Sequence, residues 1–425
     1  MTESKEEKFY DKKISRRQML KYTGAGAAGI AIGASGLGGI LNVFGMTAPD
    51  DDESAVNKVN FYGAHQSGIA NEVPTHVYFA SLNVTVKSLK ELQNLFKAWT
   101  PLTVRLMNGE PIGEASSNGF VPAKDTGESK GLDASNLTIT FGVGPSLFEK
   151  PELGLAHKRP SELKQLPHFP KDQLETAYSD GDICIQACAD DPQVAFHAVR
   201  NLIRAASGKV TMKWSQAGFN SYPMKKNKKQ TPRNLFAFKD GTVNINTKSK
   251  TDMNETVWVQ PGESASWMTG GSYLVTRRIQ MHLETWDRTA LGEQEATFGR
   301  HRDSGAPLGL HHEMDDLGLD RKESSGEMTI PADSHGRLAR ESGERILRRS
   351  FSYSSGVIDS TGTFDAGLLF ISFQKHPKQF IKIQNSFGRV DKLNEYITHR
   401  GSALFACFPG VQKGSYIGEA LFKSL

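Results

Sequence analysis

Cysteine is scarce in this sequence, with 3 residues in 425. Such a small, odd number excludes a disulfide-rich scaffold, and the spacing of Cys184, Cys188 and Cys407 matches neither a zinc site nor a Cys-x-x-Cys-His attachment motif. A strong charge imbalance is also absent, because the formal net charge is +4. The lysine-rich residues 225–229 have no interleaved aromatics, so the sequence gives no indication of nucleic-acid binding.

Strongly hydrophobic runs are missing as well. Residues 22–46 are only weakly hydrophobic and are rich in glycine and alanine, which makes them a poor permanent membrane anchor. They follow Arg16-Arg17, and a positive segment before a hydrophobic one predicts an export signal. The arginine pair resembles the twin-arginine consensus, so we expect an export signal over residues 1–48 and an acidic linker over 49–58. This predicts an extracytoplasmic location in the cell envelope, in the periplasm or outside the cell.

The remaining sequence has the composition of a soluble globular protein, with 38% hydrophobic and 23% charged residues. In the first half, apolar runs predict strands at 75–86, 136–143, 182–187 and 210–214, with helices after residue 89 and over 191–206. Strand, helix, strand, strand, helix, strand is the ferredoxin-like order. We therefore predict an N-terminal ferredoxin-like domain over residues 59–225.

The second half repeats this pattern less regularly. Strands are predicted at 234–238, 272–279, 345–353 and 368–374, and helices at 280–289 and 376–387. We predict an α+β fold with a second ferredoxin-like domain over residues 226–425. The stretch 293–333 is too long for an ordinary connection and predicts a functional loop that covers a site.

One carboxylate stands out in the second domain. Asp240 lies in a glycine-bounded turn within residues 234–244, directly after an apolar run. An Asp-Gly pair alone is typical of an ordinary turn. Downstream, however, come Ser334-His335 and then the arginine-rich run 346–353.

Aspartate, histidine and arginine in this order resemble the haem pocket of the dye-decolourising (DyP-type) peroxidase family. The resemblance extends from about residue 61 to the C-terminus and includes residues 125–129, 181–185, 267–273, 304–309 and 367–374. Within the family the chain is most similar to the exported EfeB-type branch, described as deferrochelatase/peroxidase and associated with iron uptake. The resemblance implies two ferredoxin-like domains of the dimeric α/β-barrel type. It also implies non-covalent haem b, bound mainly by the C-terminal domain.

The family turn is usually Gly-x-x-Asp-Gly, and here its first position is Ala237. An ordinary φ angle would tolerate alanine at this position, whereas a left-handed one would be strained.

The resemblance implies that His335 is the axial ligand of the haem iron. His311-His312 is a rival, but adjacent residues do not share a face and cannot both point simply into one small site. A ligating imidazole usually donates its other N–H to a carboxylate. Asp391 and Glu395 are the candidates for that carboxylate.

On the opposite side of the haem, the resemblance implies Asp240 as the base and Arg348 as the positive group that stabilises the leaving hydroxide. Arg349 should point to the other face of the strand, and a shift of one position would exchange the two arginines. Aspartate remains a carboxylate at pH values where histidine is already protonated, which predicts an acid optimum.

Further pocket positions follow from the resemblance. Gly241, Thr242, Asn244 and Ser350 match pocket positions, and the apolar run around Phe370 and Phe373 offers alternate side chains to the porphyrin. Core packing explains that run equally well. Arg300, His301 and Arg302 are candidates for the propionates, and Trp267, Trp286 and Tyr353 for an electron relay.

The function implied by the resemblance is the reduction of hydrogen peroxide with oxidation of dyes, phenols or ferrous iron. Expected partners are the twin-arginine translocase, a ferrous permease and an iron-binding lipoprotein. Two alternatives stay open: a deferrochelatase that releases iron from haem with the porphyrin intact, and a non-enzymatic haem carrier. The sequence does not determine whether the chain forms a homo-oligomer.

Overall fold

The computed structural model describes residues 57–114, 118–225, 228–388 and 390–423. Residues 57–425 form one compact unit. The expected export signal and most of the expected acidic linker fall within residues 1–56, and they lie outside the described residues. Among the helices of the described part, none is long and apolar enough to cross a membrane.

The first half of this unit has the predicted element order. Helix α3 begins where the Ser88 side chain accepts a hydrogen bond from the N–H of Glu91, and α4 begins after the Asp191 cap with Pro192 in its first turn. The strand order β2-β3-β1-β4 is ferredoxin-like. The elements are β1 (His76–Val84), α3 (Leu89–Met107), β2 (Thr138–Val143), β3 (Ile183–Ala189), α4 (Pro192–Ala205) and β4 (Val210–Phe219).

The second half contains the same arrangement with longer connections. Its strand order β11-β7-β10-β9 corresponds to that of the first half read in the opposite direction, β4-β1-β3-β2. The elements are β7 (Ser272–Met281), α6 (Leu283–Trp286), α7 (Leu291–Phe298), α8 (His335–Glu341), β8 (Leu347–Arg348), β9 (Phe351–Ile358), β10 (Thr363–Gln374), α9 (Pro377–Phe387) and β11 (Ile397–Cys407). Helices α5 (Lys250–Thr256) and α10 (Glu419–Phe422), the small hairpin β5 (Met224–Lys225) and β6 (Lys228–Lys229), and 3-10 turns complete the described chain.

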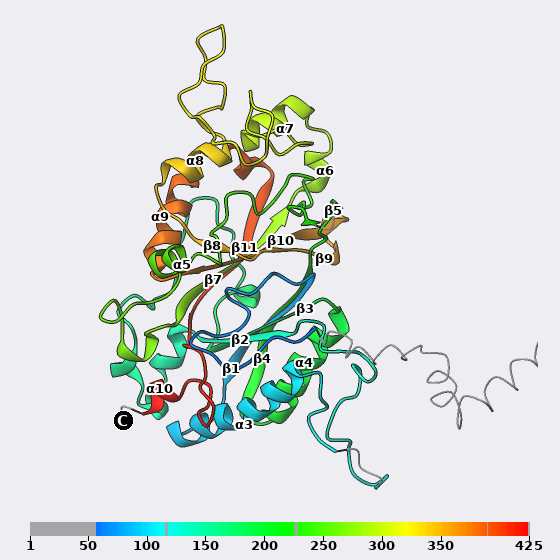
Figure 1. The fold of residues 1–425 in the computed structure, drawn as a ribbon, viewed down its shortest axis with the longest axis vertical. Coiled ribbons are helices and arrows are strands. Elements are labelled where there is room, and N and C mark those ends of the chain that lie inside the picture. Colours follow the sequence, from blue (N-terminus) through cyan, green and yellow to red (C-terminus); the bar gives the residue numbers. More distant parts are fainter. Residues whose placement is uncertain (1–56, 115–117, 226–227, 389, 424–425) are drawn as a thin grey trace, which may run out of the picture. The chain divides into compact units, whose positions relative to one another are not determined.

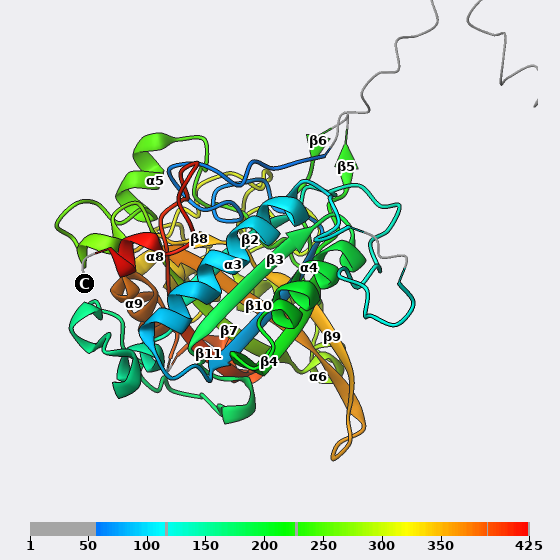
Figure 2. The same cartoon turned by 90° about the horizontal axis from the view of Figure 1, so that it is seen from below.

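The two halves share one antiparallel sheet of 9 strands. Strand β11 pairs with β2, β4 pairs with β9, and the β7–β10 pairing closes all strands except β8 into a barrel. This confirms the predicted α+β fold of the dimeric α/β-barrel type. Helices α3 and α4 lie toward one end of the molecule and α6 to α9 toward the other (Figure 1), and α3 runs alongside β3 in the view from below (Figure 2).

Apolar side chains fill the barrel, including Phe79, Phe351 and Phe405. All three cysteines lie in this interior as free thiols. Separate apolar clusters pack under the helices on the two outer faces. The barrel is thus a packed core, and any site must lie outside it or at its ends.

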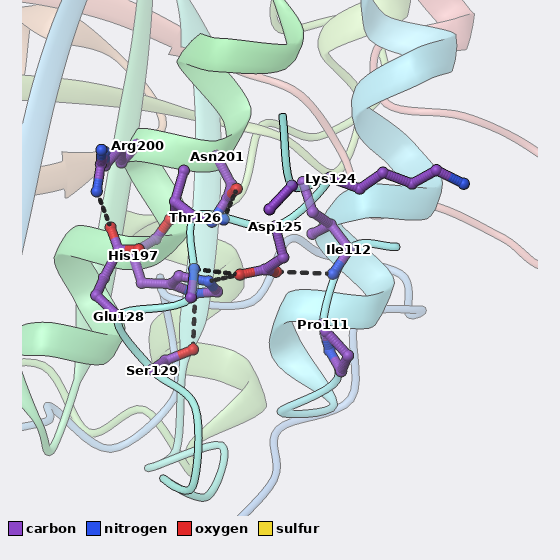
Figure 3. A network of polar contacts seen from close by, with 12 residues as sticks. Pro111, Ile112, Lys124, Asp125, Thr126, Glu128, Ser129, His197, Arg200 and Asn201 are labelled. Carbon is purple, nitrogen blue, oxygen red and sulfur yellow. Dashed lines mark hydrogen bonds and ion pairs between the residues drawn. The ribbon is translucent and has the colours of Figure 1, made fainter. Parts of the chain in front are cut away.

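A polar network holds the loop between α3 and β2 against α4 (Figure 3). His197 on α4 contacts Asp125 through Nε2 at 2.8 Å and Ser129 through Nδ1 at 3.0 Å, while the Asn201 amide donates to Thr126. Burial alone would raise the pKa of Asp125, but hydrogen bonds from His197 and from two backbone N–H groups leave it lowered. These contacts give the polar residues of segment 125–129 a structural role.

The predicted strand at 234–238 is wrong. These residues form a tight loop in which the Asn234 side chain accepts hydrogen bonds from the N–H groups of Phe236 and Phe238, at 3.1 and 3.3 Å. Phe236 and Phe238 are apolar because they pack beside Trp286, and the run therefore resembled a strand.

The other differences are in the second half. The strand that completes its ferredoxin-like order is β11, which was not predicted. The predicted helix at 280–289 is reduced to the short α6, since β7 continues to Met281. The predicted strand at 345–353 is interrupted between β8 and β9, at residues 349–350.

Candidate active site

His335 is the first residue of α8, directly after the Ser334 cap. Its Nδ1 lies 2.7 Å from Oδ2 of Asp391, which confirms Asp391 rather than Glu395 as the carboxylate partner. The other oxygen of Asp391 accepts the N–H of Leu393 at 2.9 Å, and the Asp391 side chain is only 2% exposed. A carboxylate can only accept, so Nδ1 donates the proton of this hydrogen bond, and in the neutral imidazole the lone pair is then on Nε2. His335 is therefore prepared to act as a metal ligand through Nε2.

Aromatic rings surround this imidazole. Phe387 stacks on it with ring centroids 4.3 Å apart, and Phe298 meets it edge-on at 6.3 Å. Phe298 in turn stacks on Phe238 at 4.2 Å. The imidazole thus borders the apolar cluster formed by the 235–238 loop and the segment after α9, a suitable wall for a flat hydrophobic ligand.

Asp240 and Arg348 form the second part of the site. Nη1 of Arg348 lies 3.2 Å from Oδ1 of Asp240, and Nη2 donates to the carbonyl oxygen of Thr242 at 2.9 Å. The Asn244 side chain bonds both the carbonyl oxygen and the N–H of Arg348, at 2.7 and 3.0 Å. The turn and the arginine therefore fix each other, although 104 positions separate Asn244 from Arg348.

This pair borders a cavity of about 290 Å³. Gly241, Asn244, Ser350 and Leu368 also line it. Leu368 and Phe298 pack against the same aromatic cluster, and Phe298 contacts His335, so Leu368 connects the cavity with the surroundings of His335. The structure therefore places the predicted residues from two distant segments around one space.

The turn that holds Asp240 has an unusual backbone. Ala237 has φ of 67°, Gly241 has φ of 126° and Val243 has φ of 59°. Left-handed geometry is disfavoured for alanine and still more for a β-branched valine. Ala237 therefore has the strained left-handed φ rather than an ordinary one, and this backbone strain lies close to the Asp240 carboxylate.

Sequence reasoning missed Glu313, which comes from the long loop after α7. It accepts hydrogen bonds from Lys239 and Thr231 at 2.5 Å each and from Thr242 at 3.0 Å. Burial alone would raise the pKa of Glu313, but these donors leave it lowered. The long loop thus reaches the Asp240 turn, as its length suggested, and no local signal in the sequence marks Glu313.

The predicted porphyrin contacts and propionate candidates do not all lie at one pocket. Phe370 packs beside Phe380 under α9, whereas Phe373 lies inside the barrel, so the two occupy opposite faces of β10 and cannot line the same pocket. Of the propionate candidates, Arg300 donates to two loop carbonyls and His301 contacts Glu295 at 3.0 Å.

The remaining aromatic candidates are buried. Trp267 lies in the large cluster under the helices, and its indole N–H donates to the Lys158 carbonyl oxygen. Trp286 lies in the aromatic cluster beside Phe236, and the ring of Tyr353 covers the Arg278 guanidinium at 4.4 Å. Core packing is sufficient to explain aromatic residues at these three positions, and an electron relay is not needed to explain them.

Comparisons with known proteins match the whole described unit. Residues 66–220 match the family described as Dyp-type peroxidase, N-terminal, and residues 231–412 match Dyp-type peroxidase, C-terminal. The chain is 35% identical over 421 residues to proteins named Deferrochelatase from Escherichia coli (strain K12) and Shigella sonnei, covering 96% of this chain and 97% of each relative.

Solved structures give the same result. The oxyferrous complex of DtpA from Streptomyces lividans superposes with a TM-score of 0.80 at 35% identity, covering 86% of this chain and 97% of that chain. A DyP-type peroxidase from Streptomyces coelicolor matches equally well, with the same score, identity and coverage. A dye-decolorizing protein from V. cholerae, at 20% identity and a TM-score of 0.57 over 81% of this chain and 96% of that chain, shares the fold.

Proposed function

This chain belongs to the Dyp-type peroxidase family, and from that premise we propose that it is a haem-dependent peroxidase. It reduces hydrogen peroxide and oxidises an electron donor. Two observations support the proposal: the hydrogen bond between His335 and Asp391, and the Asp240–Arg348 pair at the cavity. Dyes, phenols and ferrous iron are the donors we propose.

The residues fit non-covalent haem b. His335 would hold the haem iron through Nε2, and Phe298 and Phe387 would provide apolar contacts beside it. Phe370 and Leu368 share one face of β10 and extend that wall. The three cysteines of the chain lie buried in the barrel interior and are not available for covalent attachment.

Bound haem would supply a redox-active, Lewis-acidic iron. The protein supplies the proton transfers. Asp240 accepts a proton from peroxide and can return it to the departing hydroxide, a role that contributes about 10²–10⁴-fold in general acid–base catalysis. Arg348 contacts the Asp240 carboxylate and offers a fixed positive charge where negative charge develops. Gly241, Asn244 and Ser350 line the wall that would position peroxide or water, and the Thr242 carbonyl oxygen holds Arg348 beside it.

Deferrochelatase activity is the second candidate, and the names of the curated relatives favour it. It would use the same His335 and the same cavity. Product analysis separates the two functions: peroxide-dependent oxidation of a phenol supports the peroxidase, and metal-free protoporphyrin released under reducing conditions without peroxide supports the deferrochelatase. If neither product forms from the haem-loaded protein, both proposals are wrong.

A non-enzymatic haem carrier is the third possibility. A carrier has no use for a hydrogen-bonded Asp240–Arg348 pair at the cavity, so this pair weighs against it. Stable haem binding without any reaction with peroxide would support the carrier.

We further propose that the chain is exported by the twin-arginine translocase and acts with a ferrous permease and an iron-binding lipoprotein. The Arg16-Arg17 pair and the similarity to deferrochelatases support this context. Replacing both arginines by lysine should retain the protein in the cytoplasm, and unchanged export would contradict the proposed route. We keep residues 59–225 and 226–425 as the proposed domains, and sedimentation would determine whether the chain forms a homo-oligomer.

A further inference from the structure

Arg349 is a buried cation without a carboxylate partner. It is 2% exposed. The other strongly buried arginines of the described chain, Arg277, Arg278 and Arg337, each pair with a carboxylate, at Asp172, Asp365 and Glu341. An isolated buried charge is costly, so the difference calls for a physical explanation.

Only one of the three guanidinium nitrogens of Arg349 has a hydrogen-bond acceptor among the described residues. Nη1 donates to the carbonyl oxygen of Asn71. Nε and Nη2 have no hydrogen-bond acceptor among the described residues. These two nitrogens form one edge of the guanidinium, the edge that binds the two oxygens of a carboxylate.

The polar neighbours of Arg349 do not supply the missing negative charge. Burial raises the pKa of the Cys188 thiol to about 11 and that of the Tyr222 hydroxyl to about 12, so both stay neutral at physiological pH. Glu72 pairs with Lys229 at 2.7 Å. Burial also lowers the pKa of Arg349, although Cys188 and Tyr222 oppose this effect.

Arg349 borders the same cavity as Asp240 and Arg348. It does so because the strand is interrupted between β8 and β9, at residues 349–350, so consecutive side chains are not divided strictly between two faces. Ser350 also lines the cavity, and its hydroxyl has no partner among the described residues. Tyr222 and Asn220 complete this part of the wall.

We propose that Arg349 forms a carboxylate-binding subsite in this cavity. The carboxylate lies against the Nε–Nη2 edge, and the Ser350 hydroxyl and Tyr222 hydroxyl are the additional donors within the wall. The assignment of the subsite rests on the unpaired cation and the cavity, and it does not require the proposed peroxidase function. Where that function holds, the subsite admits an anionic molecule beside the peroxide site.

Two sources of the carboxylate are distinguishable. A small free carboxylate would bind as formate does, whereas an aromatic acid would bring its ring into the cavity together with the head group. The cavity of about 290 Å³ has room for either. Formate represents the first source, and benzoate, compared with the uncharged benzamide, represents the second.

The experiment measures the melting temperature and the binding isotherm of the haem-loaded protein with sodium formate, against sodium chloride at equal ionic strength. We expect saturable stabilisation by formate, because a ligand that binds only the folded state raises its stability. Arg349→Gln should weaken formate binding by about tenfold or more. The exposed Arg288→Gln is the matched control, because Arg288 does not line the cavity, and it should leave formate binding unchanged.

The measurement with benzoate shows which kind of carboxylate the subsite binds. Benzoate binding that is lost in Arg349→Gln, with no binding of benzamide, identifies an aromatic acid, and formate binding alone identifies a small carboxylate. If Arg349→Gln does not fold, Arg349→Lys keeps the charge without the planar edge and should still weaken formate binding by about tenfold.

Three results would overturn the subsite. The first is the absence of saturable formate and benzoate binding to the wild type. The second is equal binding to the wild type and Arg349→Gln. The third is a loss of haem affinity in Arg349→Gln together with its loss of formate binding, because Arg349 would then be a partner of the haem propionates. A haem affinity within about twofold of the wild type is the expected result.

Discussion

Replacing Asp391 by asparagine should weaken haem binding through the proton on His335. In the wild type, Oδ2 of Asp391 accepts the Nδ1 proton of His335 at 2.7 Å, and Oδ1 accepts the N–H of Leu393 at 2.9 Å. Asparagine has one oxygen acceptor and one NH₂ donor in place of these two oxygens. Only one of the two N–H groups can therefore keep its acceptor.

Both orientations of the new amide are unfavourable. If its oxygen faces Leu393, its NH₂ faces Nδ1 of His335, the imidazole proton moves to Nε2, and the lone pair that binds iron is lost. If its oxygen faces His335, a buried N–H of Leu393 meets an NH₂ group. Because hydrogen bonds to charged groups contribute about 1.5–3 kcal/mol, the haem dissociation constant should rise by about 10–100-fold.

The assay is titration of the haem-free protein with haemin, followed through the Soret absorbance. Glu395→Gln is the matched control, since Glu395 is an exposed carboxylate on the same 3-10 turn, Lys392–Glu395. Its affinity should stay within about twofold of the wild type. An equally small effect for Asp391→Asn would refute the role of the His335–Asp391 hydrogen bond.

Three further predictions follow from the same contacts. Ala237→Gly relieves the φ of 67° and should stabilise the fold by about 0.5–1 kcal/mol in urea unfolding; destabilisation would contradict the strained turn. Glu313→Gln should lower peroxidase activity by about tenfold through a looser Asp240 turn, whereas the exposed Glu323→Gln should not. The lowered pKa of Glu313 stabilises the fold above about pH 4.5, and this stabilisation is lost as the pH falls. A difference in unfolding free energy between the wild type and Glu313→Gln that does not change with pH would contradict this role. Burial lowers the pKa of His65 below 6.5, so the unfolded state takes up its proton first; stability should fall with pH below about 6.5, and less steeply in His65→Gln.

The sequence identified candidate site residues more readily than the contacts that surround them. Asp240, His335 and Arg348 were found through a family resemblance, and Asp391 was one of two carboxylates close to a short turn. Glu313 was missed because its contacts with Lys239 and Thr242 cross 74 and 71 positions, and no periodicity records such contacts. Arg349 was assigned to the other face of a continuous strand, and only the strand interruption brings it to the cavity.

The fold shows the same limit. Regular strands such as β1 and β10 were predicted because their apolar patterns are long. The 234–238 loop was mistaken for a strand because Phe236 and Phe238 alternate as strand residues do, although they are buried from a tight turn. Strand β11 was overlooked, and its pairing with β7 and β2 depends on barrel closure, a long-range property that local patterns do not contain.

The most direct test of the central claim is rapid mixing of the haem-loaded protein with hydrogen peroxide, comparing the wild type with Asp240→Asn. Asparagine keeps the shape and removes the base beside Arg348. We predict that Asp240→Asn binds haem as the wild type does and that its Soret band changes about 10²–10⁴ times more slowly. Equal rates for the two proteins would contradict the assignment of Asp240 as the base.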